Sequence, residues 1–216
     1  MQAKEYDAWY QTPRGRWIGE QEYQLLRTML RPATGLSMVD VGCGTGYFTR
    51  RFAADGAQVT GVDPDANMLA YAQSQCMADE RYLRGDARAL PFPAQSFDYC
   101  IAVASLCFIQ EQTSALAEMV RVTRKRIAIG FLNRNSLLYW QKGRHGGSGA
   151  YRGAHWHTPA EVRRLFLDLP VSNLQLRSAI YLPGGNRFAR TIESGLYPRI
   201  LMGGFLVATA DSVAMP

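Results

Sequence analysis

Short apolar runs alternate with segments of helical periodicity along most of the chain. The first run, Met38, Val39 and Val41, is short and β-branched, as a fully buried parallel strand requires. Strands are predicted at residues 38–41, 58–62, 82–84, 99–104, 126–132, 174–182 and 204–210. Helices are predicted at residues 19–30, 47–54, 111–122, 158–168 and 188–197. This alternation predicts an α/β protein.

The first predicted strand runs directly into a glycine loop, within SMVDVGCGTGYFT at residues 37–49. Gly42, Gly44 and Gly46 can adopt backbone angles closed to other residues, and they lack the Cβ atoms that would keep a ligand off the backbone. A dinucleotide site would need glycine at position 47, which is Tyr47. Asp40 puts a carboxylate at the strand end, which would repel a phosphate but suit an ammonium or sulfonium group. The spacing therefore favours S-adenosylmethionine.

The run Asp40-Val41-Gly42-Cys43-Gly44-Thr45-Gly46 resembles motif I of the class I S-adenosylmethionine-dependent methyltransferases. It is most similar to the small-molecule group that includes the ubiquinone and menaquinone C-methylases. The resemblance covers residues 37–132 and implies a Rossmann-like α/β fold, with a seven-stranded, mostly parallel sheet and helices on both faces. It implies S-adenosyl-L-methionine as cofactor, S-adenosyl-L-homocysteine as product, and Asp40, Gly42, Cys43 and Gly44 as cofactor contacts.

An acidic residue, Asp63, ends the second predicted strand, 17 residues beyond Gly46. A carboxylate at that place can accept hydrogen bonds from both ribose hydroxyls. Alternatively, Asp63 and Pro64 could form only a turn before a helix. The next residues resemble the helix start of the family, so Asp63, Pro64 and Met68 are predicted cofactor contacts, with Met68 on the adenine face.

Two later motifs follow in the order that the family has. Gly85-Asp86-Ala87 resembles the motif that binds the adenine amino group through an Asp side chain and the next backbone N–H, although alone it would indicate only a turn. Residues 90–98 resemble the loop that enters the fourth strand. That strand ends at Ala104, and ligands in open α/β sheets bind at the carboxyl ends of strands, so Ala104 completes the predicted cofactor contacts.

The N-terminal segment carries several aromatic residues, and its pattern Tyr-Asp-x-Trp-Tyr resembles the segment that folds over the cofactor as a lid in this family. Tyr6 and Tyr10 are the residues expected nearest to the cofactor. The same aromatic side chains could instead staple a helix against the sheet, and the sequence leaves both interpretations open.

The acceptor side carries weaker signals. No Asn-Pro-Pro-Tyr motif follows the fourth strand, which argues against methylases of adenine, cytosine or glutamine. Cys107 is predicted to be a small wall of the acceptor pocket, and no catalytic residue is assigned. Residues 133–156 are rich in glycine, aromatic and basic residues, and could either bind the acceptor or form a loop without a partner. Their predicted acceptor contacts are Tyr139, Trp140, Arg144, Tyr151, Arg152 and Trp156.

The charge is unevenly distributed along the chain. Residues 1–132 carry 14 Lys and Arg against 14 Asp and Glu, whereas residues 133–216 carry 10 against 4, so the second part holds the whole net charge of +6. This is consistent with a small anionic or aromatic acceptor, methylated by in-line displacement, and equally with a solvated basic face that has no partner. A nucleic-acid methyltransferase acting on RNA, which would use charge and stacking, and a non-catalytic cofactor-binding protein remain the alternatives.

The 216 residues fit a single domain, which we divide into an N-terminal helical lid (1–36), a cofactor-binding half (37–132) and a substrate-side half (133–216). No apolar run approaches the roughly 20 residues of a membrane span, and no signal peptide is recognised. The four cysteines lack metal-site spacing, so we expect reduced thiols, no metal and a cytoplasmic location. The oligomeric state stays open.

Overall fold

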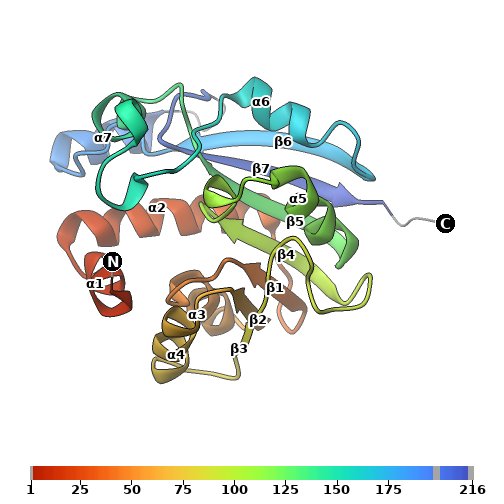
Figure 1. Cartoon of the computed structure of the whole chain (residues 1–216). Helices are drawn as coiled ribbons and strands as arrows, with labels where there is room; N and C mark the ends of the chain where they lie inside the picture. Colours follow the sequence, from red (N-terminus) through yellow and green to blue (C-terminus); the bar gives the residue numbers. More distant parts are fainter. Residues whose placement is uncertain (1, 197–199, 214–216) are drawn as a thin grey trace.

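A computed structural model describes residues 2–196 and 200–213, and it contains one sheet in the order β3-β2-β1-β4-β5-β7-β6 (Figure 1). Strands β1 to β5 run parallel, whereas β7 is antiparallel to both β5 and β6. The strands are β1 Ser37–Val41, β2 Gln58–Asp63, β3 Arg81–Arg84, β4 Phe97–Val103, β5 Thr123–Leu132, β6 Val171–Ala179 and β7 Phe205–Ser212. The predicted seven-stranded, mostly parallel sheet is confirmed.

Helices cover both faces of the sheet, as predicted (Figure 1). Alternate residues of β1 enter two separate apolar clusters: Val39 packs with α5 and α6 on one face, and Met38 packs with α2 and α3 on the other. The helices are α1 Ala3–Trp9, α2 Pro13–Leu30, α3 Tyr47–Ala54, α4 Ala66–Ser74, α5 Gln112–Arg121, α6 Pro159–Leu165 and α7 Arg187–Gly195. Within the described residues, no helix has the length and apolar character of a membrane span.

Local capping chemistry explains where two of these helices begin. The Thr12 hydroxyl accepts a hydrogen bond from the Gly15 N–H, with Pro13 in the first turn, so α2 starts earlier than the predicted residue 19. Thr158 and Glu161 form the expected capping box at the start of α6. That helix ends at Leu165, before the predicted end at residue 168.

Other boundaries also differ from the prediction. Helix α1 is an additional element, where the sequence indicated only an aromatic segment. Strand β5 begins at Thr123, directly after α5, so no separate turn occupies residues 123–125. Strand β6 ends at Ala179 because Ile180 has a positive φ of 68°. The predicted helix at 188–197 corresponds to α7, and Tyr197 lies outside the described residues.

The topology brings three loops to one edge of the sheet. Strand β1 lies between β2 and β4, with Val41 paired to Val62 at the carboxyl end. The loops that follow β1, β2 and β4 therefore begin side by side, and the topological switch point of the sheet lies between β1 and β4. The segment after β5 contains a short π-helix at Tyr139–Gly143 and 3-10 helices at Arg144–Gly146 and Gly149–Tyr151 in place of a regular α-helix.

Candidate active site

The glycine loop after β1 combines tight packing with access to a cavity. Gly42, Gly44 and Gly46 have φ values of 73°, 52° and 78°, which disfavour any side chain. A Cβ at Gly42 would lie 2.3 Å from the Ser105 Cβ, and one at Gly46 would lie 2.4 Å from the Tyr82 hydroxyl. A Cβ at Gly44 would meet nothing within 4 Å. Of these three glycines, only Gly44 thus faces open space. The Ser105 side chain packs against Gly42, and the Tyr82 side chain packs against Gly46.

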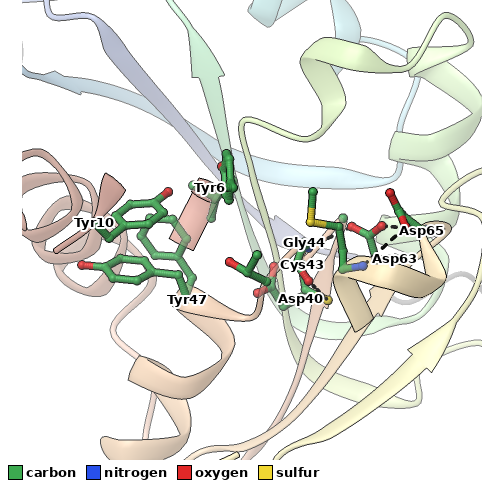
Figure 2. Close-up of a pocket in the computed structure, with 13 residues that line it drawn as sticks. Tyr6, Tyr10, Asp40, Cys43, Gly44, Tyr47, Asp63 and Asp65 are labelled. Carbon is green, nitrogen blue, oxygen red and sulfur yellow. Dashed lines mark hydrogen bonds between the residues drawn. The ribbon is translucent and has the colours of Figure 1, made fainter. Parts of the chain in front are cut away.

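Asp63 fixes the shape of this loop (Figure 2). Its Oδ2 accepts a hydrogen bond from the Gly44 N–H at 2.8 Å, and its Oδ1 accepts one from the Asp65 N–H at 2.9 Å. Burial raises the pKa of the Asp63 carboxyl, and these two backbone hydrogen bonds oppose that rise. A carboxylate that accepts one bond on each oxygen still has free lone pairs for ligand hydroxyls.

Asp40 is a second carboxyl beside the loop, almost fully buried at 2% exposure. The Thr49 hydroxyl donates to its Oδ2 at 2.7 Å. Burial raises the pKa of Asp40 to about 7, and the nearby Asp63 charge acts in the same direction. A carboxyl in this state gains most from a positively charged ligand.

These residues line a first cavity of about 240 Å³. Thr45 also lines it, and the buried hydroxyl of Thr45 lacks a hydrogen-bond partner among the described residues. An unpaired hydroxyl, two carboxyls and an open glycine backbone can together hold an amino acid with a positive charge. The residues present therefore fit the methionine end of S-adenosylmethionine.

Helix α1 closes the first cavity with aromatic rings. Tyr10 stacks on Tyr47 with ring centres 3.7 Å apart and planes 10° apart, and Figure 2 shows the two rings lying parallel. A buried ion pair of 3.0 Å joins Asp7 to Arg50 of α3, and Arg50 also donates to the Thr45 carbonyl at 2.6 Å. Tyr10 thus packs the end of α1 against α3, and it also lines the first cavity.

A second cavity of about 610 Å³ lies beside the first, over the ends of β2 and β4. Asp86 lines it, but Arg88 binds this carboxylate through its backbone N–H at 2.9 Å and its guanidinium at 2.6 Å. These hydrogen bonds lower the pKa of Asp86 to about 2. Arg88 also pairs with Glu111 at 3.1 Å. The predicted cofactor residues in its lining are Tyr6, Gly42, Asp63, Pro64, Gly85, Asp86, Ala87 and Ala104.

A third cavity, of about 520 Å³, is mainly apolar and lies between the N-terminal helices and the segment after β5. Two carboxylates and two cations line it beside the apolar groups, and Tyr151 lines it as predicted. Its main apolar walls are Trp9, Ile18, Phe108, Leu132, Leu138 and Phe205. Its charged residues are Glu5, Arg14, Glu22 and Lys142.

The three cavities meet at the end of β4. Tyr6 and Val103 line all of them, Met68 lines the first and third, and Ala104 lines the second and third. Cys43 contributes to the first cavity. A ligand in the first two cavities would therefore face the third across Tyr6 and Val103. The strand-end rule that selected Ala104 could also have selected Val103, whereas no local signal marks Glu22.

The other predicted acceptor residues are placed differently. The Cys107 Sγ accepts a hydrogen bond from the Leu132 N–H at 3.3 Å inside the core, and burial raises its thiol pKa to about 12. Trp156 is buried against Tyr139, whereas Trp140 is 63% exposed with the Arg144 guanidinium 4.8 Å from its ring centre. Arg152 is exposed and lines none of the three cavities. The same three cavities are also not lined by the remaining predicted acceptor residues Cys107, Tyr139, Trp140, Arg144 and Trp156.

Comparisons with known proteins agree with this geometry. Residues 39–128 match the family described as Methyltransferase domain. These matched residues are those of a class I S-adenosylmethionine-dependent methyltransferase domain. That match runs from within β1 to within β5, and it includes the glycine loop, Asp63 and the end of β4. The family prediction is thus confirmed.

Curated relatives match part of this chain in sequence, whereas a solved structure matches nearly all of it in fold. A malonyl-[acyl-carrier protein] O-methyltransferase of Pectobacterium atrosepticum is 42% identical over 103 residues, 47% of this chain and 40% of that protein. The Serratia marcescens protein of that name is 39% identical over 147 residues, 68% and 53% of the two chains. This chain thus spans about half the length of these relatives or less.

The structural relative covers nearly the whole of both chains. It is a Thermotoga maritima protein described as an S-adenosylmethionine-dependent methyltransferase and possible histamine N-methyltransferase. The TM-score is 0.76 at 22% identity, with 97% of this chain and 96% of that chain covered. This likeness confirms the fold.

Proposed function

We propose that this protein transfers a methyl group from S-adenosylmethionine to a small, partly apolar acceptor. The observation that carries the proposal is the junction at Tyr6 and Val103, where cavities lined by Asp40 and Asp63 meet the apolar third cavity. The bound cofactor would supply an activated methyl group at this junction. In-line displacement there requires the protein mainly to position the two reactants.

In this proposal the first cavity holds the amino acid end of the cofactor and the second holds its nucleoside. Asp40 would face positive charge, Asp63 the ribose hydroxyls, and Asp86 the adenine amino group. The remaining proposed contacts are Tyr6, Tyr10, Gly42, Cys43, Gly44, Pro64, Met68, Gly85, Ala87 and Ala104. Residues 1–36, 37–132 and 133–216 would act as lid, cofactor half and substrate side of one domain.

The third cavity suits an acceptor with an aromatic or other apolar body. Trp9 and Tyr151 offer aromatic surfaces, and Arg14 and Lys142 offer contacts for an anionic end. Some relatives are named malonyl-[acyl-carrier protein] O-methyltransferases, and the free carboxylate of a malonyl group is an anion of this kind. Nucleic acid is the less favoured acceptor, because carboxylates accompany these cations among the lining residues. We also propose a cytoplasmic location, supported by four free cysteines.

Cofactor binding is the direct test. Calorimetry should show saturable binding of S-adenosylmethionine and S-adenosylhomocysteine and no binding of NAD, because Asp40 disfavours a pyrophosphate beside the loop. Release of S-adenosylhomocysteine with a panel of aromatic amines, phenols and carboxylates would then identify an acceptor. If NAD binds and S-adenosylmethionine does not, the proposal is wrong.

The position of the acceptor can be tested with two variants once an acceptor is found. Because Tyr151 lines the third cavity, Tyr151→Ala should raise the acceptor KM about tenfold, the scale of a lost aromatic contact. The paired substitution of Arg144 and Arg152 by glutamine should change KM less than about twofold, since neither lines that cavity. The opposite result would support the prediction from sequence that these arginines hold an acceptor anion.

A further inference from the structure

Glu22 stands out among the charged residues of the third cavity. It lies within α2, is partly buried, and lines the cavity together with Ile18 of the same helix. No hydrogen bond or ion pair joins its carboxylate to another residue within 2–196 or 200–213. By contrast, Glu20 on the same helix pairs with Arg51 at 2.5 Å.

An unpaired carboxylate among apolar walls is unstable, because burial disfavours its charged form. Burial raises the pKa of Glu22 to about 8. The Glu22 charge also raises the pKa of the Tyr6, Tyr10 and Tyr151 hydroxyls, where burial is the larger cause. Glu22 is therefore electrostatically coupled to Tyr6 at the junction, and a bound cation would relieve its cost of burial.

We propose that Glu22 binds the ammonium group of a small amine acceptor and takes its proton before methyl transfer. This inference rests on the proposed methyltransferase function and adds the reacting group of the acceptor. The amine nitrogen passes one proton to the Glu22 carboxylate and so gains a free electron pair. The nitrogen then bonds to the methyl carbon as the carbon–sulfur bond breaks, and that bond's electrons stay on sulfur. The products are a methylated ammonium and a neutral thioether.

The rival role is the reverse: a protonated Glu22 would donate a hydrogen bond to a carboxylate acceptor. Two probes with the same ring and opposite charge separate these roles, 2-phenylethylamine and 3-phenylpropanoate. With protein saturated by S-adenosylhomocysteine, calorimetry should show tighter binding of the amine. Glu22→Gln should weaken amine binding at least tenfold, because glutamine offers no negative charge. Glu20→Gln is the matched control and should leave amine binding unchanged within about twofold.

The pH profile gives a second readout. Amine binding should strengthen from pH 6 to 8, because ionisation of Glu22 creates the anion that pairs with the ammonium. Tyr6, Tyr10, Tyr47 and Tyr151 have raised pKa values and stay neutral in this range. The other charged residues that line the same cavity are Glu5, Arg14 and Lys142. Asp40 titrates in the same range, so the profile of Glu22→Gln must be subtracted.

The outcomes distinguish this inference from the function on which it rests. Loss of amine binding and of its pH dependence in Glu22→Gln, with unchanged affinity for S-adenosylhomocysteine, would support it. Tighter binding of 3-phenylpropanoate, or equal amine binding by wild type and Glu22→Gln, would overturn it and leave the methyltransferase proposal standing. Failure of the wild type to bind S-adenosylmethionine or its product would refute both.

Discussion

Asp63→Ala should weaken the binding of S-adenosylmethionine by about 3 kcal/mol, or about two orders of magnitude. The carboxylate would bind the ribose hydroxyls, and hydrogen bonds to charged groups contribute about 1.5 to 3 kcal/mol. The substitution also removes the acceptor of the Gly44 N–H, which is held at 2.8 Å. The glycine loop would then lose its shape beside the cofactor. Isothermal titration calorimetry measures the change directly.

Asp98→Ala is the matched control for this substitution. Asp98 also accepts a backbone hydrogen bond, from the Ser37 N–H at 3.1 Å, and it lines none of the three cavities. Its loss should lower the free energy of unfolding by about 1.5 to 3 kcal/mol, as for other hydrogen bonds to charged groups, and change cofactor affinity less than about threefold. Asp63→Ala should remain folded by circular dichroism. Unchanged cofactor affinity in Asp63→Ala would place the ribose site elsewhere.

The affinity for S-adenosylmethionine should rise about tenfold per pH unit below pH 7 and level off above it. The pKa of Asp40 is raised to about 7 by burial, so the carboxylate that faces the positive ligand forms only as the pH reaches that value. Asp40→Asn should bind more weakly at pH 8 and lose most of this dependence. Calorimetry from pH 5.5 to 8.5 on both proteins provides the measurement.

The stability of the ligand-free protein should change in the opposite sense. A carboxyl whose pKa is raised on folding binds more protons when folded, so stability falls as the pH rises from about 4 to about 7. For Asp40 the pKa rises from 3.8 to about 7, which corresponds to a loss of about 4 kcal/mol in the free energy of unfolding, at 1.36 kcal/mol per pKa unit. Asp40→Asn should therefore be the more stable ligand-free protein at pH 8. Equal denaturant midpoints at pH 5 and 8 in the wild type would contradict this.

The sequence by itself determined the cofactor half of the molecule. The glycine loop and the carboxylate Asp40 are contiguous in the chain, and Asp63 follows one helix and one strand later. The connection between two parallel strands through a helix is right-handed, so the sequence of such a unit determines on which side of the first strand the helix lies. Spacing along the chain therefore translates directly into spacing at the sheet edge. For that reason the fold class, the loop and the place of Asp63 could be predicted without coordinates.

Side-chain directions outside this unit were decided by the tertiary structure. The sequence placed Cys107 near the end of β4, but its sulfur turns inward to the Leu132 N–H. Trp156 is likewise buried, although it occurs in a glycine-rich and basic segment. Asp86 is in the predicted place, yet Arg88 already binds its carboxylate. Apolar area and hydrogen-bond partners supplied by distant elements determine these directions, and spacing does not encode them.

The third cavity depends on the tertiary structure for the same reason. Its walls come from α1, α2, the end of β4, the segment after β5 and the start of β7, and Figure 1 shows how far along the chain these elements are spread. Glu22 follows the ordinary pattern of a polar position on a helix, so the sequence offers no sign that it faces a cavity. It does so because α2 packs on the sheet with that edge of the helix toward residues 138–151. Packing between segments distant in sequence thus created the third cavity, where we propose that an acceptor binds.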